Sequence, residues 1–108
     1  MAASTKGGNA ALSDGVSTYT GKWASVITAN ETNQLKAKAG KVGHIIVWGV
    51  GTSWVIDVYD DPDSNDSAVW QWVTADGKGI FALQLPVQTG IRVVTSGTTP
   101  GSATVVWE

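Results

Sequence analysis

Short apolar runs separated by turn-forming residues occupy most of the chain beyond its N-terminal part. The longest such stretch is residues 35–60, where two β-branched segments, 42–48 and 54–59, flank the glycine-rich residues 49–53. Valine, isoleucine, tryptophan and tyrosine suit the pleated surface of a strand, and glycine supplies the positive φ that a tight reversal needs. The pattern therefore predicts a β-hairpin formed by these two segments.

The pleat of a strand places alternate residues on opposite faces, which predicts which side of each strand is buried. Trp54, Ile56 and Val58 share one face, and Asp57 lies on the other. Because an unpaired carboxylate is costly to bury, the apolar face is the expected core face. In residues 42–48 neither face is polar, and we expect this strand to be covered on both sides.

Further strands are predicted from the same period of two. Their turns are marked by the polar residues 28–34, by Asp76-Gly77, which is a hairpin signal, and by Pro100-Gly101. Pro86 argues against a central strand at that point. The additional strands are residues 23–27, 35–41, 68–73, 80–85, 90–95 and 103–107.

Seven or eight short strands with no helix are typical of an all-β protein, here a small β-sandwich of jelly-roll or immunoglobulin-like type. Residues 22–108 form the predicted sandwich domain. Residues 1–21 are mostly small or polar and predict a flexible N-terminal arm that docks on a partner. The residues expected to be buried are Ile56, Val58, Leu83, Leu85, Val93 and Val105.

Composition narrows the range of partners. The chain has 108 residues, of which 15% are charged, with a formal net charge of −2. It therefore lacks the basic surface that nucleic acid requires, and no apolar run is long enough to span a membrane. The absence of cysteine excludes disulfides and thiolate metal sites. The N-terminus has no apolar segment of the secretory kind, so we expect no export by that route.

The acidic loop at residues 60–67 is the one segment with metal-ligand character. Asp61, Asp63 and Asn65 have the spacing of a calcium loop, but Asp66 stands where that motif needs glycine. Trp72 stands where the motif needs its bidentate glutamate. The sequence therefore predicts a solvated turn with no metal and no other cofactor.

The sequence offers little support for catalysis. His44 is the single histidine, and a relay through it would need a hydroxyl and a carboxylate such as Asp57. No nucleophile motif surrounds any serine or threonine, and the spacing of the acidic residues selects no catalytic pair. We expect a protein that is not an enzyme, and a small hydrolase using carboxylates is the less favoured alternative.

Six tryptophans are a high count for a chain of this length. Trp70 and Trp72 share a strand face and could form a platform for a surface glycan, so a carbohydrate-binding module is one alternative. Packing in the core or in a subunit interface is the favoured interpretation, because aromatic residues are enriched there. The candidate interface residues are Trp23, Trp48, Trp70, Trp72 and Trp107.

Three stretches resemble a known group of proteins: Leu-Lys at 35–36, GKVGHIIV at 40–47 and GIRVVTSGTTPGSATVVW at 90–107. They are similar to small all-β proteins encoded among the virion genes of tailed bacteriophages. The likeness covers residues 35–108 and leaves the N-terminal third unmatched. The tryptophans of the central strands and the longer acidic loop depart from that group.

The resemblance implies a structural virion protein, either a capsid decoration (cement) protein or a head-fibre or tail component, with no catalytic residues to carry over. It also implies synthesis in the host cytoplasm and a final location at the capsid surface. The implied partners are the major capsid protein or other virion proteins, bound by a homo-oligomer for which a trimer is favoured.

Overall fold

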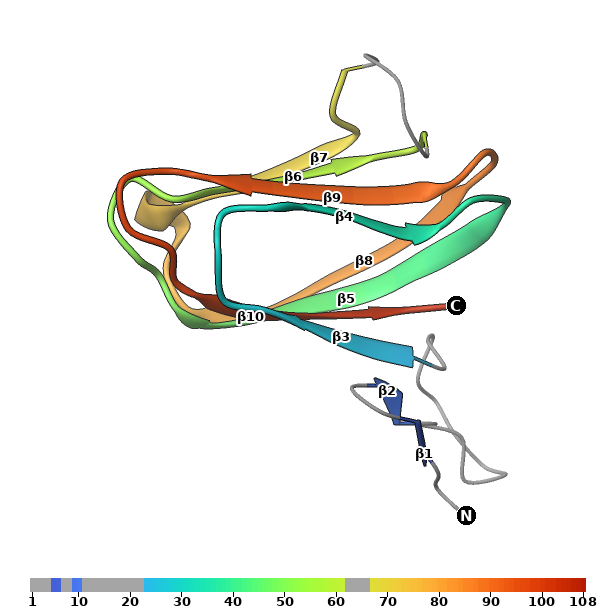
Figure 1. Ribbon diagram of the computed structural model, residues 1–108, viewed down its shortest axis with the longest axis horizontal. Coiled ribbons are helices and arrows are strands. Elements are labelled where there is room, and N and C mark those ends of the chain that lie inside the picture. The colour runs from blue at the N-terminus through green and yellow to red at the C-terminus, as the bar shows by residue number, and fades with distance from the viewer. Residues whose placement is uncertain (1–4, 7–8, 11–22, 62–66) are drawn as a thin grey trace.

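The computed structural model describes residues 5–6, 9–10, 23–61 and 67–108 (Figure 1). The predicted N-terminal arm lies outside these residues, apart from β1 (Thr5–Lys6) and β2 (Asn9–Ala10), which pair with each other. β2 lies close to β3. The remaining strands are β3 (Trp23–Ile27), β4 (Thr32–Lys36), β5 (Gly40–Gly49), β6 (Val55–Tyr59), β7 (Trp70–Val73), β8 (Gly79–Val87), β9 (Ile91–Ser96) and β10 (Ser102–Trp107).

Strands β3 to β10 form two antiparallel four-stranded sheets that pack face to face, which confirms the predicted β-sandwich (Figure 1). Sheet I has the order β3-β10-β5-β8, and sheet II has the order β4-β9-β6-β7. The chain passes from one sheet to the other at every connection between these strands except β6 to β7. Numbered from one to eight, the orders are 1-8-3-6 and 2-7-4-5, which is the jelly-roll arrangement.

The two predicted hairpins are wrong. β5 pairs with β10 and β8, whereas β6 pairs with β9 and β7, so the glycine-rich residues 49–53 join different sheets. At Asp76-Gly77, the short 3₁₀ turn η1 (Thr74–Asp76) likewise connects β7 of sheet II to β8 of sheet I. A glycine-rich break flanked by apolar strands is compatible with a crossover as well as a hairpin, and the local pattern does not distinguish them.

Two crossovers explain several of the glycines. The β5–β6 and β9–β10 connections run side by side (Figure 1), and the Thr52 N–H donates to the Thr99 carbonyl at 2.9 Å. A Cβ on Gly101 would collide with the backbone of Gly49, and a Cβ on Gly97 would collide with that of Ser53. Glycine is therefore required where the two connections pack backbone against backbone.

The strand predicted at residues 35–41 is misplaced. β4 spans Thr32–Lys36, so it begins in the predicted turn at 28–34 and includes only the first two residues of the predicted strand, and residues 37–39 form a bend. β4 is an edge strand whose outward residues face water, with Thr32 opposite Val94 and Gln34 opposite Arg92. Its polar composition, which suggested a turn, reflects this exposed position.

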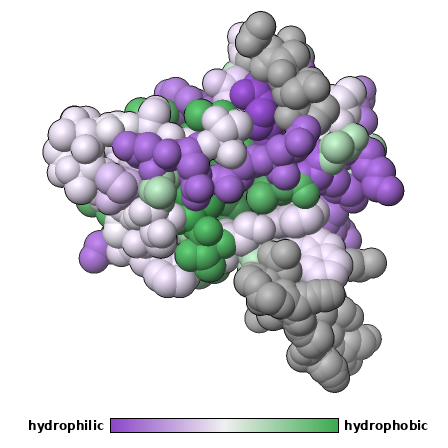
Figure 2. Space-filling view, in the orientation of Figure 1, coloured by the Kyte–Doolittle hydropathy of each residue, from purple (hydrophilic) through white to green (hydrophobic). Residues whose placement is uncertain are grey.

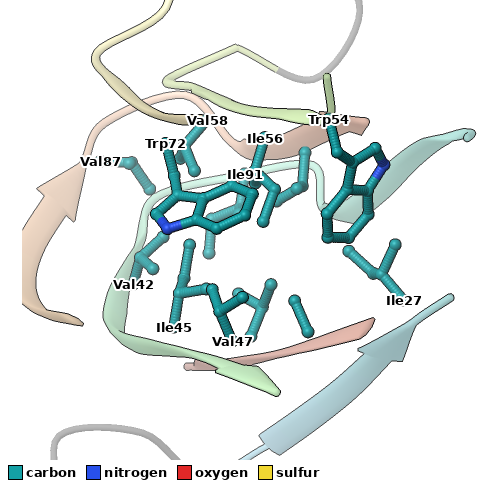
Figure 3. Packing of buried hydrophobic residues seen from close by; sticks show 13 residues of the cluster. Ile27, Val42, Ile45, Val47, Trp54, Ile56, Val58, Trp72, Val87 and Ile91 are labelled. Carbon is teal, nitrogen blue, oxygen red and sulfur yellow. The ribbon is translucent and has the colours of Figure 1, made fainter. Parts of the chain in front are cut away.

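The core lies between the sheets and is centred on two tryptophans (Figure 3). The rings of Trp54 and Trp72 meet edge to face, with centroids 5.8 Å apart. Their indole N–H groups are satisfied by Asn30 Oδ1 at 2.9 Å and the Gly77 carbonyl at 3.1 Å, respectively. Residues from both sheets close around them: Ile27, Val42, Ile45, Val47, Ile56, Val58, Val87, Ile91, Val93, Ala103 and Val105.

Four of the six residues predicted to be buried are fully buried: Ile56, Val58, Val93 and Val105. Leu83 and Leu85 pack against the core but are only half-buried, so the prediction is wrong for them. Both belong to β8, an edge strand of sheet I. The ladder with β5 is also irregular there, where Gln84 has a φ of +51°.

Candidate functional site

The candidate site is the outer surface of sheet I, where two cross-strand rows of side chains point away from the core. The pairing register places Thr104 between Val26 and Ile46, with Ile80 beside Ile46. A second row follows in the same way, and Trp48 lies further along β5. We call this surface the outer apolar face; it comprises Ala24, Val26, His44, Ile46, Trp48, Ile80, Ala82, Thr104 and Val106.

This face follows from strand alternation in strands whose other side is also apolar. On β5, Ile45 and Val47 point into the core, so Ile46 and Trp48 point outward. The sequence predicted that this strand would be covered on both sides, yet Trp48 is 52% exposed. Val26 is 53% exposed and Ile80 70% exposed, so three of the four exposed large hydrophobic residues in the described chain lie on this face.

The outer apolar face has no lysine, arginine, aspartate or glutamate. The nearest opposite charges along β5 and β10 are Lys41 and Glu108, whose backbones pair at the end of the sheet with N···O distances of 2.8 and 2.9 Å. At the centre, Thr104 and Val106 are buried, and Thr104 Oγ1 has no hydrogen-bond partner among the residues that the structure describes. The centre of the face is therefore buried and has none of these four charged residue types.

The outer surface of sheet II has a different character. There Gln71 Nε2 donates to Asp57 Oδ1 at 2.8 Å, and the Arg92 guanidinium lies 4.1 Å from the centroid of the Tyr59 ring. Some half-buried valines occur among these polar groups. In Figure 2 hydrophilic colour runs across the middle of the view, and hydrophobic patches appear both above it and below it, toward β3 of sheet I. The sandwich thus has one polar and one apolar outer face.

The five candidate interface tryptophans are dispersed. Trp48 lies on the outer apolar face, whereas Trp72 is fully buried in the core and cannot contact a partner in this fold. Trp70 is half-buried against Phe81, with ring centroids 6.1 Å apart. Trp23 and Trp107 are half-buried neighbours whose ring centroids are 6.4 Å apart. The Trp107 indole N–H donates to Ser25 Oγ at 3.0 Å.

These positions remove the basis for a Trp70–Trp72 sugar platform, since one ring is in the core. The aliphatic members of the face, Val26, Ile46 and Ile80, are not among the interface residues predicted from the sequence. Strand alternation could have identified them, because adjacent residues of a strand point to opposite faces. Ile80 must therefore point away from the face of Phe81, and Val26 away from the face of Ile27. Recognising them required knowing which side of each strand the second sheet covers.

The residues considered for catalysis do not converge. His44 lies on the outside of sheet I and Asp57 on the outside of sheet II, with the core between them. A shallow, mostly apolar depression lies beside Trp54, and its one threonine, Thr74, donates its hydroxyl to the Val50 carbonyl at 2.8 Å. None of its lining residues is titratable: Ser53, Trp54, Val55, Val73, Thr74 and Ala75.

The described part of the acidic loop has a structural role. Asp60 accepts hydrogen bonds from the backbone N–H groups of Gln88 and Thr89, each at 2.9 Å, and so holds the β8–β9 turn. Asp63, Asn65 and Asp66 lie outside the described residues. Among the residues that the structure describes, no group of three or more histidine or acidic side chains could hold a metal ion.

A comparison with protein-family models, with curated proteins and with solved structures finds no significant match. The fold itself is known from viral capsid proteins, lectins and cupins, and it does not select among their functions. No helix in the described ranges is long and apolar enough to cross a membrane. Function must therefore be argued from the surface of the sandwich.

Proposed function

We propose that this chain is a non-enzymatic structural protein of a bacteriophage virion, and specifically a capsid decoration protein that binds and stabilises the head. The observation that carries the proposal is the outer apolar face, which exposes Val26, Trp48 and Ile80 on one side of the sandwich. Contiguous apolar surface on a small soluble domain marks a site of protein contact. The resemblance to virion proteins supports the proposal that the assembly to which the protein belongs is a bacteriophage virion.

The energetics suit a protein that acts in many copies. Burial of apolar surface stabilises a contact by about 25 cal/mol per Å², so a few hundred Å² per contact is significant when repeated over a shell. An oligomer engages several sites at once and gains avidity without any new type of contact. The proposed partner is the major capsid protein or another virion protein, bound by a homo-oligomer at the capsid surface.

The test uses particles of the phage that encodes the chain, assembled without it. Purified protein is added, particles are separated by sedimentation, and bound protein is quantified together with the temperature at which the particles release their DNA. We expect saturable binding and a higher release temperature. A protein that never co-sediments with the particles, although it is folded by circular dichroism, would contradict the proposal.

A further inference from the structure

We infer that the outer apolar face is the contact surface between copies of this chain. The inference deepens the proposed function, on which its biological setting rests, by naming the partner of this face. It commits to a second copy of the chain, whose own outer apolar face packs on this one.

Charge complementarity favours a second copy. A charged group on a partner would lose its hydration against this face without gaining a counter-ion, which is costly. A second copy presents the same rows without lysine, arginine, aspartate or glutamate, so none of these charged residues is buried when two such faces meet. Lys41 and Glu108, which have opposite charges, lie next to each other at the margin, where neighbouring copies can pair them. The outer surface of sheet II would instead bury Asp57 and Arg92.

Shape favours the same partner. A pleated sheet packs best on another sheet, with interdigitating side chains and a spacing of about 10 Å. One row of the face contains only β-branched residues: Val26, Thr104, Ile46 and Ile80. Most of the residues that sheet I presents to the core are also β-branched. The outer side of sheet I is thus built much like its inner side, which already packs on a sheet.

The exposed side chains lie where a second copy would reach them. Thr104 and Val106 are buried at the centre of the face, while Val26 and Ile80 are exposed on the two edge strands, β3 and β8. Trp48 lies further along β5 and offers the large aromatic surface that dominates contact energies in interfaces. Contact with a second copy through these three residues would bury the exposed parts of the face, as its centre is already buried.

The experiment compares Val26→Asp with Val69→Asp in the full chain. The two valines are matched: Val26 is 53% exposed on this face, and Val69 is 47% exposed before β7 of sheet II. Ile80→Lys is the second variant on the face, in case Val26→Asp disturbs β3. Each variant is checked for folding by circular dichroism, and its mass is measured by light scattering and sedimentation velocity over a range of concentrations.

We expect the wild type and Val69→Asp to be oligomeric, and Val26→Asp and Ile80→Lys to associate roughly a hundredfold more weakly, because each would bury an unpaired charge. A monomeric wild type would overturn the inference. So would an oligomer that persists unchanged in both folded face variants.

Particle binding separates this inference from the proposed function. A monomeric wild type whose particle binding is lost in Val26→Asp would assign the face to a virion protein, which overturns the inference and keeps the function. An oligomer that dissociates in Val26→Asp but never binds particles would support the inference and contradict the function.

Discussion

Two buried threonines show how the same side chain can affect stability in opposite directions. Thr95 Oγ1 donates to the Ala29 carbonyl at 2.6 Å and accepts from the Glu31 N–H at 3.0 Å, so it joins β9 to the β3–β4 connection. Thr104 Oγ1 is also buried but has no partner. A buried hydroxyl without a hydrogen bond loses its hydration and gains nothing in return.

Substitution by valine, which keeps the branched shape but lacks the hydroxyl, should change stability in opposite directions at the two sites. We expect Thr95→Val to lower the free energy of unfolding by about 1–2 kcal/mol and Thr104→Val to raise it by up to about 1 kcal/mol. Urea denaturation followed by tryptophan fluorescence measures both. Equal losses in the two variants would show that the Thr104 hydroxyl does have a partner.

Asp60 gives stability a dependence on pH. Partial desolvation raises the pKa of the Asp60 carboxyl, but hydrogen bonds from the backbone N–H groups of residues 88–90 and from the Thr89 hydroxyl outweigh it and hold the pKa below its usual value. The folded state therefore binds a proton at this site less readily than the unfolded chain does. The stability from Asp60 is complete above the unfolded pKa and is lost as pH falls through the folded pKa.

Asp60→Asn tests this directly, because asparagine does not titrate. We expect the wild type to be the more stable protein at neutral pH, and its advantage to shrink as pH falls below about 4. The measurement is the free energy of unfolding of both proteins from neutral to acidic pH. An advantage that stays constant down to pH 2 would show that the turn contacts do not depend on the charge.

At the scale of elements, the strands were largely predictable and their partners were not. The period of two located β3, β6, β9 and β10 closely, because alternation is a local property of the sequence. The sheet that a strand joins depends on its connections, and residues 49–53 fit a hairpin and a crossover equally well. β4 was misplaced because an edge strand with polar outward residues has the composition of a turn.

The crossover glycines allow this explanation to be tested. Gly101→Ala should destabilise the protein by about 2 kcal/mol or more, because its Cβ would collide with the backbone of Gly49 and Gly51, which cannot rotate away. Gly49→Ala is the matched control in the same contact, where the nearest atom to a new Cβ would be Ser102 N at 3.4 Å. It should change stability by less than about 1 kcal/mol in either direction.

Both variants can be measured by thermal unfolding in the same buffer. A large loss confined to Gly101→Ala would show that backbone contact between the crossovers is essential. Similar small effects at both positions would mean that the connections can move apart at little cost.

For the whole molecule, the main feature is the difference between its two outer faces. The sequence indicated an oligomeric assembly through its high tryptophan content, but only Trp48 of the five candidates lies on the outer apolar face. The aliphatic residues that dominate this face are individually ordinary. They form a surface only because the jelly-roll order places β3 and β8 on either side of β10 and β5.

Deletion of residues 1–21 tests the predicted arm. We expect the shortened chain to keep its sandwich and its oligomeric mass, because the core and the outer apolar face are built from residue 23 onward. Particle binding should weaken if the arm docks on a virion protein. Circular dichroism, light scattering and co-sedimentation with particles measure the three properties, and unchanged particle binding would remove the role proposed for the arm.

The position of β10 has a consequence for biosynthesis. It is the last of the eight sandwich strands to leave the ribosome, yet it pairs with β3 on one side and β5 on the other. A nascent chain that lacks it cannot complete sheet I, so folding must wait for nearly the whole domain to be synthesised. Such non-local pairing folds slowly, on a scale of milliseconds to seconds, and exposes unpaired strand edges to aggregation meanwhile. A premature stop before residue 102 should therefore give an insoluble chain rather than a smaller folded one.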